Sequence, residues 1–189
     1  MVTNRLAQEE IDAGEDQCFT DLAQRLQAKI SAEFGKGQMR RDAHPKMHGL
    51  VKAEFTVESS LPEQCQIGIF KELGKSWPAW VRFSNQSGTM QDDIKGDIRG
   101  MAIKLMGVHG KKLLPAEEDA PTQDFIVIST KVFVTRNPQE FDALVKALMK
   151  GGLAMIWFFA THLHDTLNLL RSNRKFANPL QIEYFSTTP

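Results

Sequence analysis

Two histidines in a basic segment are the first residues whose types could do chemistry. Residues 38–49 read QMRRDAHPKMHG, so His44 and His48 stand four positions apart behind Arg41. Histidines at this spacing could share a helix face and bind a metal ion, but Pro45 interrupts a helix and no third ligand is near. A histidine ahead of a strand is a candidate general base, because the ordinary pKa of imidazole lies close to neutral pH. The alternative is an ordinary loop histidine.

An arginine among apolar neighbours is the second feature. Arg82 lies in the run WVRFSN, and its charge needs an anionic partner if that face of the chain is buried. A carboxylate of a ligand or of the protein would serve. The segment GDIRG at residues 96–100 permits a close backbone approach, but it lacks the ending of a phosphate-binding loop. Asp97 and Arg99 are therefore expected to fix a turn.

The elements that must position these residues follow from hydrophobic periodicity. Apolar residues near the 3.6-residue period predict a helix over residues 7–34. Asn137-Pro138 predicts the start of a helical stretch to about residue 172, with a break at residues 151–152. Alternating or β-branched runs predict strands at residues 50–57, 79–84, 100–108, 125–135 and 180–185. This order predicts an α+β fold with antiparallel strands.

Composition excludes several classes of protein. The 189 residues include 23 Lys and Arg and 23 Asp and Glu, and zero net charge argues against a dedicated nucleic-acid binder. The longest apolar run, residues 153–160, is far shorter than the roughly 20 residues of a membrane span. The first residues lack the apolar core of a signal peptide, so a cytoplasmic protein is expected. Cys18 and Cys65 are expected to be reduced thiols.

Five segments, taken in order, resemble the haem domain of the catalase family. They are RRDAHPK at 40–46, AEFTV at 53–57, WVRFSNQSG at 80–88, DIRGMAIKL at 97–105 and FVTRNPQEF at 133–141. Their details are most similar to the small bacterial catalase-like branch, whose members are described as haem peroxidases. The resemblance implies an antiparallel β-barrel core, incomplete in this chain, with an N-terminal helix and a long helical segment after the fourth strand.

The resemblance also implies roles for single residues, with haem b as cofactor and hydrogen peroxide or an organic hydroperoxide as substrate. His44 matches the distal histidine that moves a proton between the peroxide oxygens, and Ser84 matches the serine that orients it. His48 is a rival distal base, because the segment from His44 to Phe55 is one residue longer than in true catalases. The residues that match haem contacts are Arg41 and Arg82 at the propionates, Ala43 above the haem plane, and Phe133 and Phe141 along the haem.

The sequence departs from the family pattern at two places. The distal asparagine falls near Ile128 or Ser129, and neither side chain can fully replace its amide. Peroxidase chemistry is therefore expected over efficient dismutation of hydrogen peroxide. The family's iron ligand is a tyrosinate in an Arg-x-x-x-Tyr context, whereas Tyr184, the one tyrosine, follows Leu180 at that spacing. The iron ligand is expected outside this chain.

These observations predict two segments and leave three functions open. We expect an N-terminal helical arm at residues 1–37 and the distal part of a haem domain at residues 38–189, truncated at its C-terminus. The first function is a catalase-like peroxidase, an oxidoreductase if the proximal half is supplied. The second is a non-catalytic remnant that binds haem or a small ligand, and the third is a likeness of fold alone. Family catalases form tetramers with entwined N-terminal arms, so a homo-oligomer is a further expectation.

Overall fold

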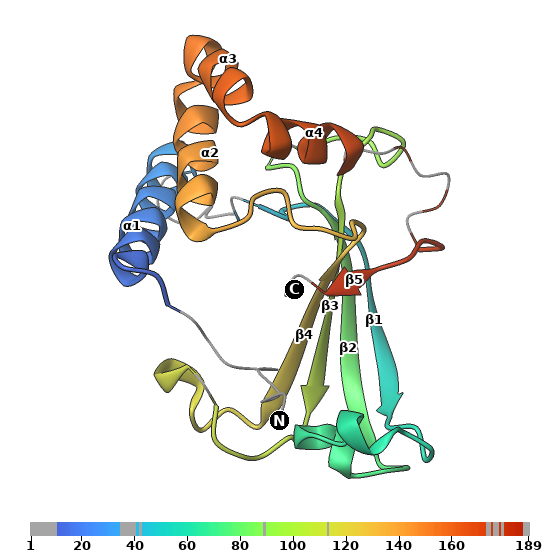
Figure 1. The fold of residues 1–189 in the computed structure, drawn as a ribbon. Helices are drawn as coiled ribbons and strands as arrows, with labels where there is room; N and C mark the ends of the chain where they lie inside the picture. The colour runs from blue at the N-terminus through green and yellow to red at the C-terminus, as the bar shows by residue number, and fades with distance from the viewer. Residues whose placement is uncertain are drawn as a thin grey trace. The chain divides into compact units, whose positions relative to one another are not determined.

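The chain forms two compact units. The computed structural model describes residues 11–34, 41, 43–88, 90–112, 114–172, 175, 178 and 180–186. One unit comprises residues 1–42 and 133–171, and the other comprises residues 43–132 and 172–189. The first is the helical unit and the second is the sheet unit (Figure 1). The site residues predicted from the sequence are therefore divided between two units.

The helical unit combines one helix that precedes the first strand with three helices that follow the fourth strand. Its helices are α1 (Glu15–Phe34), α2 (Pro138–Lys150), α3 (Gly152–Thr161) and α4 (Leu163–Ser172). Asn137 caps α2, because its side-chain oxygen accepts a hydrogen bond from the Glu140 backbone N–H at 2.8 Å. The predicted break after α2 is confirmed, with Gly151 at a φ of 62°. A second break at His162, between α3 and α4, is not predicted from the sequence.

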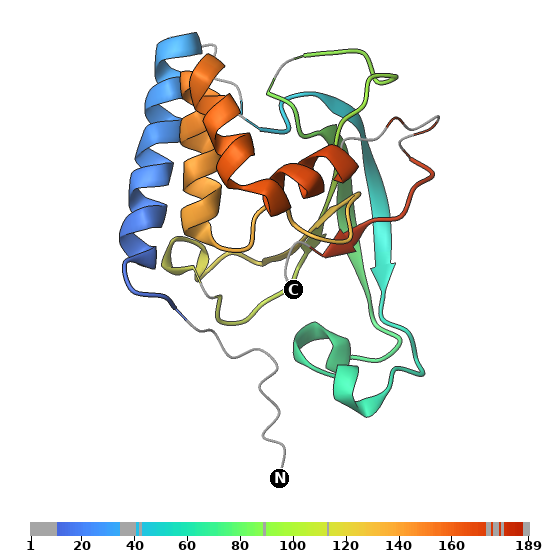
Figure 2. The same ribbon diagram turned by 45° about the horizontal axis from the view of Figure 1, so that its top comes forward.

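Helix α1 is shorter than the periodicity predicts. The sequence predicts a helix from residue 7, but residues 11–14 are not helical and α1 begins after Gly14, whose φ is 82°. Residues 7–10 lie outside the described residues. α1 and α2 run side by side (Figure 2), and Arg25 of α1 forms an ion pair with the buried Asp142 of α2. A charged contact therefore joins two segments that are distant in sequence.

The sheet unit holds five antiparallel strands in the order β1-β2-β3-β4-β5. They are β1 (Met47–Thr56), β2 (Ser76–Asn85), β3 (Arg99–Met106), β4 (Thr122–Ile128) and β5 (Phe185–Ser186). The short 3₁₀ helices are η1 (Glu63–Cys65), η2 (Gly68–Lys71) and η3 (Pro115–Glu117). The predicted α+β fold is confirmed: an N-terminal helix, an antiparallel sheet that stays open among the described residues, and helices after β4.

Strand bounds differ most from prediction at β4. The sequence predicts a strand over residues 125–135, whereas β4 begins at Thr122 and ends at Ile128. The Thr130 hydroxyl donates a hydrogen bond to the Val132 carbonyl at 2.9 Å, and this local bond turns the chain where β-branched residues predict extension. The predicted last strand is likewise reduced to two residues, β5.

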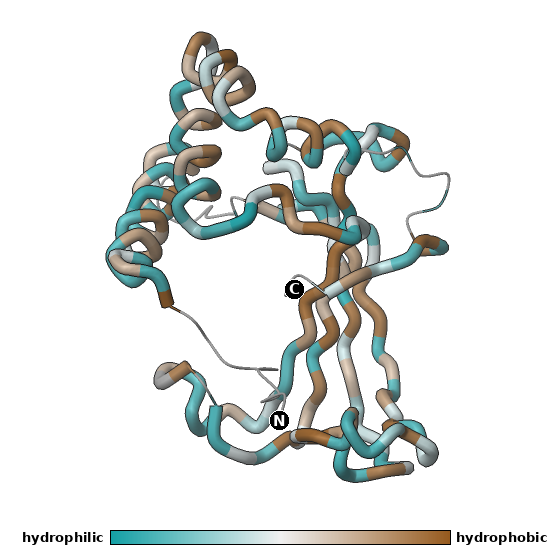
Figure 3. The backbone as a smooth tube through the Cα atoms, in the orientation of Figure 1, coloured by the Kyte–Doolittle hydropathy of each residue, from teal (hydrophilic) through white to brown (hydrophobic). Residues whose placement is uncertain are grey.

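The strand register separates two faces of the sheet. Directly paired residues of antiparallel strands place their side chains on the same face. Two rows define the Ser84 face: Met47, Ser84, Gly100 and Ile128, and next to it Leu50, Arg82, Ala102 and Ile126. The opposite face, the Leu105 face, carries the core: Val57, Trp77, Ala79, Leu105 and Val108, with Phe55, Phe70 and Phe125 packed against it. Figure 3 shows that hydrophobic residues make up much of the length of the strands, with hydrophilic residues between them.

Burial on β1 follows the predicted alternation only at one end. The sequence predicts a half-buried strand with Val51, Ala53, Phe55 and Val57 inside. Val57 is 2% exposed, but Val51 is 48% exposed and Ala53 is exposed as well. β1 is an edge strand of an open sheet, so the described residues cover only the end that packs on Trp77.

Candidate functional site

His44 and Ser84 meet at one end of the sheet. His44 Nδ1 lies 3.0 Å from Ser84 Oγ, and the serine is 3% exposed. Ser84 pairs with Gly100 across β2 and β3, so the imidazole is held over the place where β3 begins. If Nδ1 donates to the hydroxyl oxygen, Nε2 on the opposite edge of the ring carries the lone pair. This arrangement orients one imidazole nitrogen for proton exchange.

The backbone of His44 is held in an uncommon conformation. Its φ is 56°, in the left-handed region that few residues other than glycine adopt. The His44 N–H donates to the Gln86 carbonyl at 3.1 Å, and Arg82 Nη2 donates to the His44 carbonyl at 2.6 Å. Because both backbone polar groups of His44 are bonded, the surrounding chain fixes this conformation. Strained residues held in this way cluster at functional sites.

The Ser84 face also offers an apolar surface beside a cation. Leu50 and Ile126 lie in the same row as Arg82 and are 49% and 55% exposed. Met47, next to Ser84, is 47% exposed. Exposed apolar residues that gather around an arginine suit a ligand with a flat apolar body and an acidic group. The residues present therefore fit the distal side and a propionate of haem.

The position predicted for the distal amide is occupied by a hydrocarbon side chain. Ile128 pairs with Gly100, shares the Ser84 face and is 7% exposed. Ser129 cannot take the role freely, because its hydroxyl accepts a hydrogen bond from the Arg99 backbone N–H at 2.9 Å. Its own N–H donates to the Arg99 carbonyl at 2.9 Å. The register settles which of the two candidates shares a face with Ser84, and it is the apolar one.

His48 lies in different surroundings from His44. The pairing of β1 with β2 is irregular between Met47 and Gly49, and an extra residue at such a bulge re-aims its side chain. His48 Nδ1 lies 3.0 Å from Asp93 Oδ1, and His48 Nε2 lies 3.4 Å from Arg99 Nη1. Arg99 shares its face with Leu105, so His48 is held among charged groups away from Ser84.

A network of charged groups fixes the loop between β2 and β3. A hydrogen bond from Lys46 lowers the pKa of Asp93, burial opposes this, and the contact with His48 lowers the pKa further. The fully buried Arg99 donates to the Asp93 carbonyl at 2.6 Å and to the Lys95 carbonyl at 2.9 Å. Asp97 accepts from the Ser87 backbone N–H at 3.1 Å. The expectation that Asp97 and Arg99 fix a turn is confirmed.

Tyr184 contacts the Leu105 face. Its ring centroid lies 6.2 Å from that of Phe83, which pairs with Met101 on the face opposite Ser84. Burial raises the pKa of the Tyr184 phenol, and the nearby Arg99 guanidinium partly offsets the rise. The phenol therefore lies on the side of the sheet away from His44. Tyr184 does not fit an iron ligand for a haem on the Ser84 face.

The other predicted site residues are exposed or belong to the helical unit. Ala43 precedes His44 and is exposed. Phe133 and Phe141 pair within the helical unit, with ring centroids 5.7 Å apart. Arg41 belongs to that unit too and is exposed. The sheet unit by itself thus brings together His44, Ser84 and Arg82.

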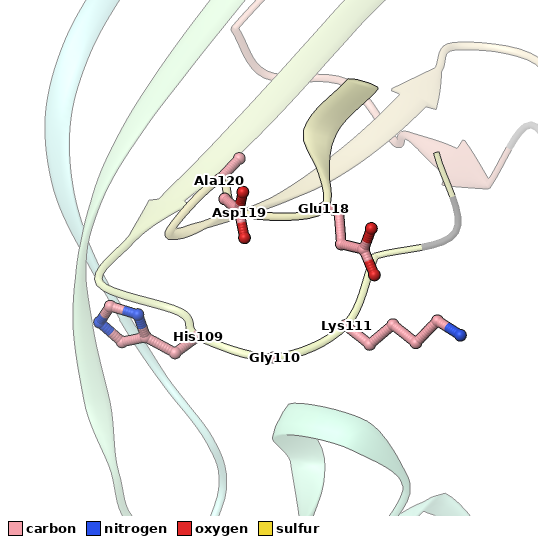
Figure 4. Close-up of a pocket in the computed structure, with 6 residues that line it drawn as sticks. All are labelled: His109, Gly110, Lys111, Glu118, Asp119 and Ala120. Carbon is pink, nitrogen blue, oxygen red and sulfur yellow. The ribbon is translucent and has the colours of Figure 1, made fainter. Parts of the chain in front are cut away.

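A cavity elsewhere in the sheet unit lacks convergent chemistry. About 350 Å³ in volume, it lies in the connection between β3 and β4 and is lined by His109, Gly110, Lys111, Glu118, Asp119 and Ala120. The side chains of His109 and Lys111 point apart (Figure 4). Within the described residues, no group of three or more His, Cys, Asp or Glu could hold a metal ion. The described helices include none that is both long and apolar enough to cross a membrane.

Comparison with known proteins gives a consistent result. The family model described as Catalase matches residues 18–169. A protein named "Catalase" from Staphylococcus epidermidis is 29% identical over 144 residues, which are 71% of this chain and 26% of the relative. A "Catalase-like protein" from Staphylococcus aureus is 28% identical over 151 residues, 75% of this chain and 30% of the relative. The chain thus spans less than a third of the length of these relatives.

Gly100 belongs to the site, although the sequence assigns it no functional role. The motif around residues 96–100 indicates only a close backbone approach, yet Gly100 lies between Ser84 and Ile128 and faces the His44 ring. Gly100 stands inside a predicted strand, and a glycine there often marks a place where another group approaches the backbone closely. That signal could have identified Gly100 as a site residue. The β3–β4 register, and no local sequence pattern, determines that Ile128 and not Ser129 shares the face of Ser84.

Proposed function

The chain belongs to the catalase family, and from this premise we propose that it supplies the distal side of a haem site at which a peroxide is cleaved. The observation that carries the proposal is the contact of 3.0 Å between His44 Nδ1 and Ser84 Oγ, on the sheet face that also bears Arg82. When bound, haem b supplies a redox-active iron at which an O–O bond can be broken. The residues 38–189 form the distal part of the haem domain in this proposal.

His44 is the proposed proton carrier. With Nδ1 3.0 Å from Ser84 Oγ, we assign the proton of the neutral ring to Nδ1, where the hydroxyl oxygen would accept it, so that Nε2 takes the proton from one peroxide oxygen. The same nitrogen returns the proton to the other oxygen, which then departs as water or an alcohol. Such acid–base assistance contributes about 10²–10⁴-fold in rate.

Arg82 and its neighbours would hold the cofactor. The guanidinium would pair with a propionate, and the exposed side chains of Leu50 and Ile126 would contact the apolar macrocycle. Arg41, Ala43, Phe133 and Phe141 are further proposed haem contacts, supported by their match to the family motifs. The iron ligand is proposed to come from outside this chain, because Tyr184 contacts the opposite face.

An organic hydroperoxide suits this site better than hydrogen peroxide. Ile128 shares the Ser84 face and can donate no hydrogen bond to a small polar peroxide. The apolar side chains of the Ser84 face, Ile128 and the exposed Ile126 among them, instead favour contact with the carbon chain of an alkyl hydroperoxide. We therefore propose peroxidase chemistry rather than efficient dismutation.

Haem binding is tested first with the purified 189-residue chain. Titration with haemin is followed by the Soret absorbance. Arg82→Leu should weaken binding about tenfold to a hundredfold, since a hydrogen bond to a charged group is worth about 1.5–3 kcal/mol. Lys104→Leu is the matched control, because Lys104 lies on the same face and pairs with Asp124 at 2.9 Å. Equal weakening by both variants would contradict the role of Arg82.

The proton carrier is tested with the haem-loaded protein and cumene hydroperoxide. His44→Ala should remove most of the peroxidase activity, while His48→Ala should retain haem uptake and most of the rate. Unchanged activity in His44→Ala would show that His44 is not the distal base. Loss of activity in His48→Ala alone would transfer the role to His48.

A non-catalytic binding protein is the second candidate function. Two observations favour it: Ile128 stands on the Ser84 face, and Tyr184 contacts the other face. Such a protein would take up haem or a small apolar ligand on the same surface without turnover. Haem uptake with no peroxidase activity above that of His44→Ala, both in this chain and in a longer version that supplies an iron ligand, would select this alternative.

A further inference from the structure

Gly100 lies closer to the His44 ring than any side chain would permit. An ideal Cβ built on Gly100 would lie 2.6 Å from His44 Cε1, 2.8 Å from His44 Nδ1 and 3.3 Å from Ser84 Oγ. Carbon atoms in van der Waals contact lie about 3.5–4.0 Å apart, so the first two distances are severe clashes. Gly100 is buried and is absent from the residues with positive φ, so its backbone conformation does not require glycine. The close approach of the imidazole requires it.

The His44 ring cannot retreat by a backbone movement. Its N–H is bonded to the Gln86 carbonyl at 3.1 Å, and its carbonyl is bonded to Arg82 Nη2 at 2.6 Å. A methyl group at position 100 would therefore turn the ring about its side-chain bonds. Turning the ring moves Nδ1 away from Ser84 Oγ, 3.0 Å distant, so the orienting contact is the first interaction to be lost.

A second glycine in the sheet shows what an uncrowded position looks like. Gly49 in β1 has no atom within 4 Å of an ideal Cβ, and its φ is not positive either. It pairs with Phe83 of β2, next to the Ser84 row. An alanine there would keep the backbone and touch nothing. Gly49 and Gly100 thus differ in the contact with His44.

From this difference we infer that Gly100 is a positioning residue, whose missing side chain sets the orientation of the His44 imidazole toward Ser84. The inference deepens the proposed function, on which its catalytic meaning rests. Gly100 acts through His44 and has no proposed contact with substrate. The His44 ring lies against the backbone of Gly100, and its Nδ1 points at the Ser84 hydroxyl.

The test uses the 189-residue chain with no haem added. Magnetic resonance records the ring carbon and nitrogen chemical shifts of the histidines, and the His44 signals are assigned by their loss in His44→Ala. Ser84→Ala is then made in the wild-type, Gly100→Ala and Gly49→Ala backgrounds. We expect Ser84→Ala to shift the His44 ring signals in the wild type and in Gly49→Ala. In Gly100→Ala that shift should vanish, because the contact with Ser84 is already lost.

The inference can be overturned by several outcomes. The first is an equal response of His44 to Ser84→Ala in all three backgrounds. The second concerns a Gly100→Ala chain that does not fold: the double variant Gly100→Ala with His44→Ala lacks the ring and should fold like His44→Ala alone. A double variant that stays unfolded shows that Gly100 serves the strand and not the imidazole.

The result separates this inference from the proposed function. Coupling between Gly100 and the His44–Ser84 contact, together with no haem uptake, would leave the positioning role intact and remove the peroxidase proposal. Haem-dependent turnover that falls in His44→Ala but is unaffected in Gly100→Ala would support the peroxidase proposal and remove the positioning role of Gly100. Full activity and unchanged His44 ring signals in Gly100→Ala would show that the ring tolerates a methyl group there.

Discussion

The two faces of one sheet differ in what their residues are used for. On the Leu105 face, Leu105 is fully buried and Trp77 is 4% exposed, so packing dominates. On the Ser84 face, Arg82 and the strained His44 lie beside exposed apolar side chains. Because neighbouring residues of a strand point to opposite faces, stability and candidate chemistry alternate along the same strands. Substitutions one position apart should therefore have different kinds of consequence.

The largest expected effect tests the packing side of this contrast. Leu105→Ala should lower the free energy of unfolding by about 2–5 kcal/mol, because it leaves a cavity in the core. Ile126→Ala on the Ser84 face is the matched control and should cost less than about 1 kcal/mol, since Ile126 is 55% exposed. Urea unfolding at equilibrium measures both. Equal losses would mean that the Ser84 face is also a packed core.

A smaller effect on stability is expected at the site itself. Ser84→Ala should cost roughly 1 kcal/mol of unfolding free energy and should lower the proposed peroxidase rate by about tenfold or more, because the His44 ring loses its orienting partner. Ser76→Ala, on the same strand and face, removes an exposed hydroxyl bonded to Thr56 Oγ1 at 2.7 Å. Ser76→Ala should leave the rate unchanged. If the two variants have the same rate, Ser84 does not orient His44.

The sequence predicts the order of elements better than it predicts their ends. Periodicity gives the helices and strands in the right order, because burial on one face dictates both patterns. It fails at β4, where a side-chain bond from Thr130 turns the chain although its neighbours are β-branched. It also misses the break at His162, since nothing in the local composition there resembles the glycine pair that ends α2.

The candidate site depends on pairings that no local pattern contains. His44 and Ser84 are 40 residues apart, and the register of β1 with β2 and the irregularity after Met47 bring them together. The family motif names both residues but gives no reason for Gly100. Its role depends on the 2.6 Å between an ideal Cβ at position 100 and a ring atom of His44, which lies in the segment before β1. Such contacts follow from tertiary packing.

A third, weaker effect concerns the network that holds His48 apart from His44. The hydrogen bond from Lys46 keeps the pKa of Asp93 below its ordinary value, so its carboxylate stabilises the fold above the unfolded pKa. That contribution should disappear as the pH falls below about 4. Asp93→Asn should therefore be less stable than the wild type at neutral pH, and the difference should shrink in acid.

Urea midpoints over a pH series measure this difference. Asp92→Asn is the control. The Asp92 carbonyl accepts a hydrogen bond from the Lys95 N–H at 3.1 Å, and its carboxylate contacts no side chain among the residues that the structure describes. The effect is expected to be small, since the Asp93 side chain is 47% exposed and solvent screens the pair. A difference that persists undiminished in acid would mean that the Asp93 side chain stabilises the loop by some means other than its charge.

The smallest effect at neutral pH is expected from Tyr184→Phe, which tests the assignment of Tyr184 to the Leu105 face. Burial raises the pKa of this phenol above 10.0, so the folded chain holds its proton more tightly than the unfolded chain. The wild type should lose stability relative to Tyr184→Phe as the pH rises above about 10, because ionisation then favours the unfolded state. The chain has one tyrosine, so the near-ultraviolet absorbance of phenolate reports its titration directly. A midpoint in the folded protein equal to that in urea would mean that Tyr184 is exposed to water. The phenol would then not be packed on Phe83, and the argument that excludes it as an iron ligand would fail.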